Sequence, residues 1–209
     1  LAASVLNLSA GSLGGSGSLT VRTDFNQTGG TFNPTGSVNL TRSLGLFSIG
    51  ALSTNGTITL ATTGLNDIQI TGNLQATNSG LANNVAAISV TSGRDILLGT
   101  ASASTTSLTS NTSGAIRLQA ASNLNLKVND NGNSNATTAV TAAGNLDFQA
   151  GAAIVRLDAH PLNLVTGSGQ ASLIAGSSID TGASIAAPIV LSVTLAAGSS
   201  STVGLATAT

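Results

Sequence analysis

Pairs of apolar residues separated by a single position recur along this chain at intervals of about 20 residues, a length typical of stacked-repeat proteins. Leu19 is followed at this interval by Val38, and Val38 by Ile58. Because alternate residues of a strand lie on the same face, each pair predicts a short strand with one buried face. The pairs are Leu19/Val21, Val38/Leu40, Ile58/Leu60, Ile68/Ile70, Ile88/Val90, Ile96/Leu98, Ile116/Leu118, Leu124/Leu126 and Leu146/Phe148, and the same interval also separates Ile68 from Ile88 and Ile96 from Ile116.

Within one interval a second strand follows after about eight to ten residues, which gives two or three short strands per coil. A single coil cannot bury its inward side chains, whereas coils stacked about 4.8 Å apart pair their backbones and join those side chains into one core. Segments rich in Gly and Asn separate the strands and suit sharp turns. The sequence therefore predicts an all-β fold, a β-solenoid of about 20 residues per coil and roughly nine to ten coils, in a single domain over residues 1–209.

Two phrases show the expected repeat most clearly, GAIRLQAASNLNLKV at 114–128 and GNLDFQAGAAIVRLDA at 144–159. Their separation is explained by one coil plus a looped-out insertion, NDNGNSNATT at 129–138. An antiparallel sandwich or an open barrel also has closely spaced strands, but neither explains the recurring phrases GSLTV, GSVNL, GTITL and GAIRL. The residues predicted to be buried in these two coils are Ile116, Leu118, Leu124, Leu126, Leu146, Phe148, Val155 and Leu157.

Composition excludes several classes of protein. Hydrophobic residues make up 41% of the chain and the net charge is −1, which argues against disorder. No apolar run approaches the roughly 18 residues of a membrane-spanning helix, so we expect no membrane span. Six basic residues scattered along the chain give no footprint for nucleic acid. The lack of Cys excludes a disulfide framework.

Because the chain lacks an initiator Met and a basic start, we expect it to be a mature piece or an excerpt of a longer polypeptide.

The phrases GNLQA (72–76), GAIRLQAASNLNL (114–126), GNLDFQAGAAI (144–154) and ASLIAGSSIDT (171–181) resemble the repeats of filamentous-haemagglutinin-type bacterial exoproteins. The resemblance covers most of the chain and is weakest near the N-terminus, over residues 1–50, and after Ala187. It implies a right-handed parallel β-helix in a secreted or surface-displayed adhesin or its shaft. FNPTGSV (32–38) is similar to the Asn-Pro motif of that family's secretion domain, although Asn-Pro is also an ordinary turn signal.

Catalytic chemistry has few candidate residues. Glycoside-cleaving sites use clustered carboxylates, but the chain has no Glu and its aspartates are scattered. The best candidate is RLDAHP at 156–161, where Asp158 and the single histidine, His160, stand in phase with Arg156 and near Asp147. Residues in phase along a strand share its solvent face, and a solvated patch with Arg156 paired to an acid explains them better than a catalytic site. We therefore predict no enzyme activity and no cofactor, with a polysaccharide lyase or hydrolase as the alternative.

Two segments resemble binding motifs for two further ligands, calcium ions and ice. NDNGNSN at 129–135 offers side-chain oxygens suited to Ca²⁺, but it holds one carboxylate and matches no calcium-loop spacing, so we predict no metal site. TITLATT at 57–63 is the only good fragment of the Thr-x-Thr array that ice binding needs, and its neighbours SVNLTRS and AISVTSG do not continue it.

The expected function is that of a structural or adhesive rod at the bacterial cell surface or in the extracellular medium. The end coils of a solenoid carry unpaired backbone groups that can template another chain. We therefore expect self-association into a filament, end to end or side by side. Glycans or a neighbouring cell surface are the other expected partners, and a polysaccharide-binding protein and an ice-binding solenoid are the alternatives.

Overall fold

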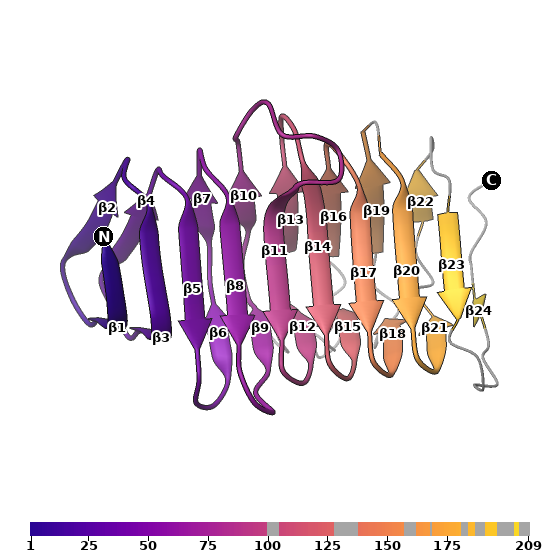
Figure 1. The fold of residues 1–209 in the computed structure, drawn as a ribbon, viewed down its shortest axis with the longest axis horizontal. Helices are drawn as coiled ribbons and strands as arrows, with labels where there is room; N and C mark the ends of the chain where they lie inside the picture. The colour runs from indigo at the N-terminus through magenta and orange to yellow at the C-terminus, as the bar shows by residue number, and fades with distance from the viewer. Residues whose placement is uncertain are drawn as a thin grey trace.

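In the computed structural model, the described residues are 1–99, 105–127, 138–156, 162–167, 169–180, 184–186, 191–195 and 203–204. Every regular element among them is a β-strand, and the strands wind into a parallel solenoid (Figure 1). In Figure 1 the nearer strands run downward and the strands behind them run upward while the chain advances to the right, so the winding is right-handed. The predicted fold class is confirmed.

Three sheets form the walls of the solenoid. Over the described residues, the front sheet contains β1 (Ala2–Leu8), β3 (Leu19–Gln27), β5 (Val38–Arg42), β8 (Ile58–Thr62), β11 (Ala86–Ser92), β14 (Ala115–Ala120), β17 (Leu146–Ala150), β20 (Ala171–Ala175) and β23 (Leu191–Leu195). The lower sheet contains β6 (Phe47–Ile49), β9 (Ile68–Ile70), β12 (Ile96–Leu98), β15 (Leu124–Lys127), β18 (Ala153–Arg156), β21 (Ser178–Asp180) and β24 (Val203–Gly204). The rear sheet contains β7 (Leu52–Thr54), β10 (Leu74–Ala76), β13 (Thr106–Ser110), β16 (Thr138–Ala142), β19 (Leu162–Thr166) and β22 (Ser184–Ala186). A separate pair, β2 (Ser12–Gly15) and β4 (Thr31–Pro34), belongs to the first coils.

The register of the front sheet shows that coil length varies. Val38 pairs with Ile58, and this coil has the predicted length. The next two coils are longer by nearly half, since Ile58 pairs with Ile88 and Ile88 pairs with Ile116. The predicted intervals from Ile68 to Ile88 and from Ile96 to Ile116 are therefore not coil repeats, because they join the lower sheet to the front sheet. Extra residues lie in the corners, so the strands keep their alignment while the coil lengthens.

Inward side chains form continuous rows. In the front sheet, Leu118 stacks between Val90 and Phe148, and all three are fully buried. Six of the eight residues predicted to be buried in the two repeated phrases have no exposed surface. Val155 is a correction, because Ile154 pairs with Leu124 in the inward row and Val155 lies half-buried on the outer face. A shift of one residue reverses the face that a strand side chain occupies. Leu157 lies outside the described residues.

Two corners depart from a plain turn. Residues 77–85, here called the strap, cross from β10 over the corner that precedes β14 (Figure 1). Within the strap, the Leu81 N–H donates to Ser113 Oγ (3.0 Å) and the Asn83 carbonyl accepts from the Asn145 N–H (2.8 Å). The strap therefore ties together coils that lie apart in the chain. Of the predicted insertion 129–138, Thr138 is the first residue of β16 and is buried, and residues 129–137 lie outside the described residues.

No helix long and apolar enough to cross a membrane occurs among the described residues.

Candidate functional surfaces

Carboxylate and amide side chains form a ladder at the corner that precedes the lower sheet. Asp67 Oδ1 accepts from the Asp95 N–H (3.1 Å), and Asp95 Oδ1 accepts from the Asn123 N–H (2.7 Å). Asn123 Oδ1 then accepts from the Ala153 N–H (3.3 Å). Each side chain thus binds the backbone of the next coil, so the ladder satisfies corner N–H groups that face no strand partner. Glycoside-cleaving sites use two carboxylates. Here the carboxylates of Asp67 and Asp95 lie on adjacent coils, and both already accept hydrogen bonds from the backbone.

Arg94 reinforces this ladder. Its Nε donates to Asp67 Oδ1 (2.6 Å), and its Nη2 forms a salt bridge with Asp67 Oδ2. The hydrogen bond from Arg94 holds the pKa of the Asp67 carboxyl below its usual value, and partial burial opposes this shift only in part. The same contact raises the pKa of Arg94. Asp67 therefore stays ionised at neutral pH and is suited to hold a cation in place rather than to act as a general acid.

Sequence reasoning missed this ladder because it treated the aspartates as scattered. A signal was present, since Asp67, Asp95 and Asn123 each stand immediately before a lower-sheet strand, in NDIQI, RDILL and SNLNL. Equivalent positions in successive repeats stack in a solenoid. An alignment of the three phrases on their apolar pairs would have placed these three side chains together.

The residues predicted as catalytic candidates are not brought together in the described part of the chain. Asp147 lies on the outer face of β17, where its Oδ2 is 3.3 Å from Arg117 Nη2 of β14. Asp158, His160 and the side chain of Arg156 lie outside the described residues, as do residues 129–135, the segment weighed above as a Ca²⁺ ligand. Among the described residues, the potential metal ligands His, Asp, Glu and Cys do not gather in any group of three. The enzyme and metal predictions stay predictions.

A shallow groove of about 460 Å³ runs across the lower end of the front sheet, on its outer face. It is lined by small residues such as Ala120 and Ala150 and by the amide side chains of Gln119 and Gln149. Gln119 Nε2 donates to Gln149 Oε1 (3.1 Å), which leaves the remaining amide donors and acceptors at the surface. The groove is therefore able to hydrogen-bond an uncharged polar ligand.

Aromatic side chains do not contribute to such recognition. The chain contains no Trp or Tyr, and its only aromatic residues are four phenylalanines. All four are buried, and they are Phe25, Phe32, Phe47 and Phe148. Aromatic rings supply the flat, apolar contact area that many interfaces use, and the lining of this groove carries hydroxyl and amide side chains instead.

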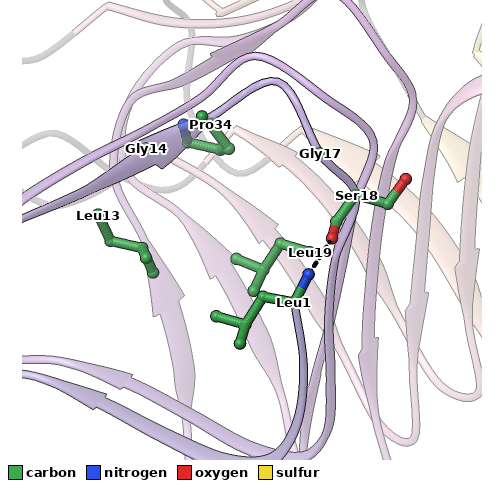
Figure 2. Close-up of a pocket in the computed structure, with 8 residues that line it drawn as sticks. Leu1, Leu13, Gly14, Gly17, Ser18, Leu19 and Pro34 are labelled. Carbon is green, nitrogen blue, oxygen red and sulfur yellow. Dashed lines mark hydrogen bonds between the residues drawn. The ribbon is translucent and has the colours of Figure 1, made fainter.

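The first coil carries a pocket of about 110 Å³. Figure 2 shows the side chains of Leu1, Leu13 and Leu19, which line this pocket. The amino group of Leu1 donates to the Ser18 carbonyl (2.8 Å), and this bond fixes the start of β1 against the turn before β3. Leu1 is 67% exposed, whereas the inward side chains of later coils are buried. Among the described strands, β1 pairs only with β3.

Comparisons with protein-family models, with curated proteins and with solved structures gave no significant match for this chain.

Proposed function

We propose that this chain is a structural and adhesive rod module of a bacterial surface fibre, and that copies of it stack end to end in the extracellular medium. The stacked walls of parallel strands supply the rod, whose front sheet of nine described strands spans about 40 Å at the usual strand spacing. The repeated phrases that resemble filamentous-haemagglutinin-type exoproteins support the same assignment.

The open edge of β1 is the observation that carries this proposal. Ala2 is in register with Thr20, and the Thr20 N–H donates to the Leu1 carbonyl (2.9 Å). In a parallel ladder this pattern directs the N–H and C=O of Ala2 away from β3. Those groups therefore face the end of the described solenoid, next to the exposed side chain of Leu1. A strand that pairs with this edge satisfies the backbone groups and covers the apolar end at the same time.

A described strand of a second copy provides a match. Among the described strands of the front sheet, β23 lies furthest from β1 and runs in the same parallel sense, so β23 of one copy can pair with β1 of the next. Such a contact joins two different surfaces of the same chain. Head-to-tail contacts of this kind do not close into a dimer and produce open filaments when the rotation between copies does not form a ring.

Light scattering and electron microscopy of the purified chain test the proposal. We expect rods whose lengths are multiples of about 40 Å. Ala2→Pro removes an outward N–H without removing a bond to β3, and proline is tolerated on an edge strand, so this variant should remain a monomer of unchanged circular dichroism. Leu1→Lys should act similarly, because it places a charge beside the apolar pocket at this end. Val85→Lys, which adds the same charge at a distant site that is 46% exposed, is the control.

A wild-type chain that stays monomeric at high concentration contradicts the stacking proposal. Assembly that survives both Ala2→Pro and Leu1→Lys also contradicts it, because then neither the edge nor the apolar end is the contact.

A polysaccharide-binding role is the second candidate, and the amide-lined groove on the front sheet favours it. If this groove binds a neutral glycan, then Gln149→Ala should lower binding on a glycan array while Thr59→Ala, on the same sheet face but outside the groove, leaves it unchanged. An ice-binding role is less favoured by the register. The outward row that contains Thr59 continues with Asn39 on one side and Ser89 on the other, and two coils further on it carries the ion pair of Arg117 and Asp147.

A further inference from the structure

Three leucines are exposed together at the corner between the front and lower sheets. Leu44 and Leu46 lie in the turn that joins β5 to β6, and Leu65 lies in the turn that joins β8 to β9. Their exposed fractions are 73% for Leu44, 47% for Leu46 and 80% for Leu65. Because β5 and β8 are neighbouring strands, the two turns belong to adjacent coils. We call these three residues the leucine knob.

The two turns project beyond the other turns of this corner. In Figure 1 the connections that leave the lower ends of β5 and β8 extend further down than those of the following coils. The later connections are shorter and carry small or polar residues, as in Gly93–Asp95 and Ala121–Asn123. The knob is thus a convex feature confined to two coils, and the other described coils do not repeat it.

Hydrogen bonds hold the knob in one conformation. Asn66 Nδ2 donates to the carbonyls of Ser43 (2.7 Å) and Thr63 (2.6 Å), and Asn66 Oδ1 accepts from the Gly45 N–H (3.0 Å). One amide side chain therefore links both turns. Gly45 has a φ of 71°, a conformation that glycine adopts without strain and that turns the chain sharply between the two leucines. A preorganised apolar tip loses little conformational entropy when it binds.

The carboxylates near the knob are already engaged, whereas the nearby cation is not paired with any described carboxylate. Asp24 Oδ1 accepts from the Ser43 N–H (3.0 Å), and Asp67 is paired with Arg94. Arg42 Nε donates to the Leu44 carbonyl (2.8 Å), which places its guanidinium at the base of the knob. Among the described residues Arg42 forms no salt bridge. A surface that carries phosphate groups above an apolar layer would therefore meet a cation and three leucines.

The size of the knob decides between the possible occupants. Its exposed fractions add up to the surface of about two leucines, which corresponds to on the order of 200 Å² of apolar side chain. Two copies that joined through their knobs would bury about twice that area, well under the roughly 1,000 Å² that a stable protein interface needs. A bilayer needs no matching surface, since it accepts a small convex apolar tip at its headgroup boundary.

We propose that the leucine knob inserts into the interfacial layer of a phospholipid bilayer and attaches the side of the rod to a membrane surface. This attachment does not depend on end-to-end stacking. Leu44 and Leu65 enter the acyl boundary, Leu46 lies at its edge, and Arg42 contacts the headgroup phosphates.

Vesicle flotation with the whole chain tests the proposal, using phosphatidylcholine vesicles and vesicles of a phosphatidylcholine and phosphatidylglycerol mixture. We expect the wild-type chain to float with both, with only modest weakening at high salt because the main contribution is apolar. Leu44→Ser combined with Leu65→Ser should lower partitioning by at least about tenfold. Val85→Ser, which removes an exposed apolar side chain elsewhere, should leave partitioning unchanged. All variants should keep the wild-type circular dichroism spectrum, since the substituted side chains are exposed.

Three results overturn the proposal. One is a wild-type chain that does not float with either vesicle. Another is flotation that the double variant retains, or that Val85→Ser loses to the same extent. The third is a wild-type chain that does not bind vesicles but forms a dimer in light scattering, where the double variant abolishes the dimer. In that case the knob binds a second copy.

Discussion

Removal of one side chain from the middle of the front sheet gives a direct measure of how the solenoid is stabilised. Leu118 lies in the inward row between Val90 and Phe148, and all three have no exposed surface. Leu118→Ala leaves a cavity whose walls cannot collapse easily, because backbone ladders on both sides fix the distance between coils. We expect a loss of about 3–4 kcal/mol in the free energy of unfolding, within the range of about 2–5 kcal/mol found for buried leucines.

Urea unfolding followed by far-ultraviolet circular dichroism measures this loss, since the chain has no Trp or Tyr to report by fluorescence. The matched control is Gln119→Ala, the next residue in β14, whose side chain is exposed and forms one hydrogen bond with Gln149. We expect it to cost less than about 1 kcal/mol. Hydrogen exchange should also show that Leu118→Ala accelerates opening in β11, β14 and β17 before β5, because each coil contacts only its neighbours.

The reasoning is refuted if Leu118→Ala and Gln119→Ala destabilise the chain equally. It is also refuted if hydrogen exchange rises uniformly along the rod, since a uniform rise means that the coils open as one unit and do not respond locally.

Three further predictions concern the corners. Because the folded pKa of Asp67 lies below its usual value of 3.8, its pairing with Arg94 stabilises the fold fully above that pH and is lost as the pH falls through the folded pKa. The difference in Tm between wild type and Asp67→Asn should therefore be largest at about pH 6 and shrink below about pH 4. Gly93→Ala would drive a Cβ into the Gly64 carbonyl oxygen and should cost about 1–3 kcal/mol in urea unfolding, whereas Gly50→Ala, with open space around it, should be nearly neutral. Ser113→Ala removes the bond from the Leu81 N–H and should raise hydrogen exchange in the strap without changing it in β17.

The sequence was sufficient to predict the fold because each apolar pair has a period of two. This period indicates a strand with one buried face, whichever sheet the strand belongs to. Leu118 and Phe148 were assigned to the core from this pattern and are buried. Coil length was not recoverable in the same way. Residues added at a corner change the interval between strands without changing any pair, so the interval from Ile68 to Ile88 looked like a coil although these residues belong to different sheets.

The other error concerned which of two neighbouring strand residues faces the core. In β18 the neighbours Ile154 and Val155 are both β-branched and apolar, and neither composition nor spacing says which one faces inward. The register with Leu124 decides in favour of Ile154. The leucine knob was missed for a related reason. Leu44 and Leu46 flank Gly45, and Leu65 follows Gly64. The sequence signal that could have found them is a large apolar residue beside a glycine in a segment that otherwise has the composition of a turn.

These observations place the distinctive features of this chain in its corners. The strap, the ladder that begins at Asp67 and the leucine knob all lie between strands, while the strands themselves form three uniform walls. In a stacked architecture a change at one corner reaches no further than the neighbouring coils, except where a segment such as the strap bridges distant coils. Loss of the knob should therefore leave the rod intact, and a blocked β1 edge should leave the knob intact. The stacking and membrane experiments thus test two independent properties of one scaffold.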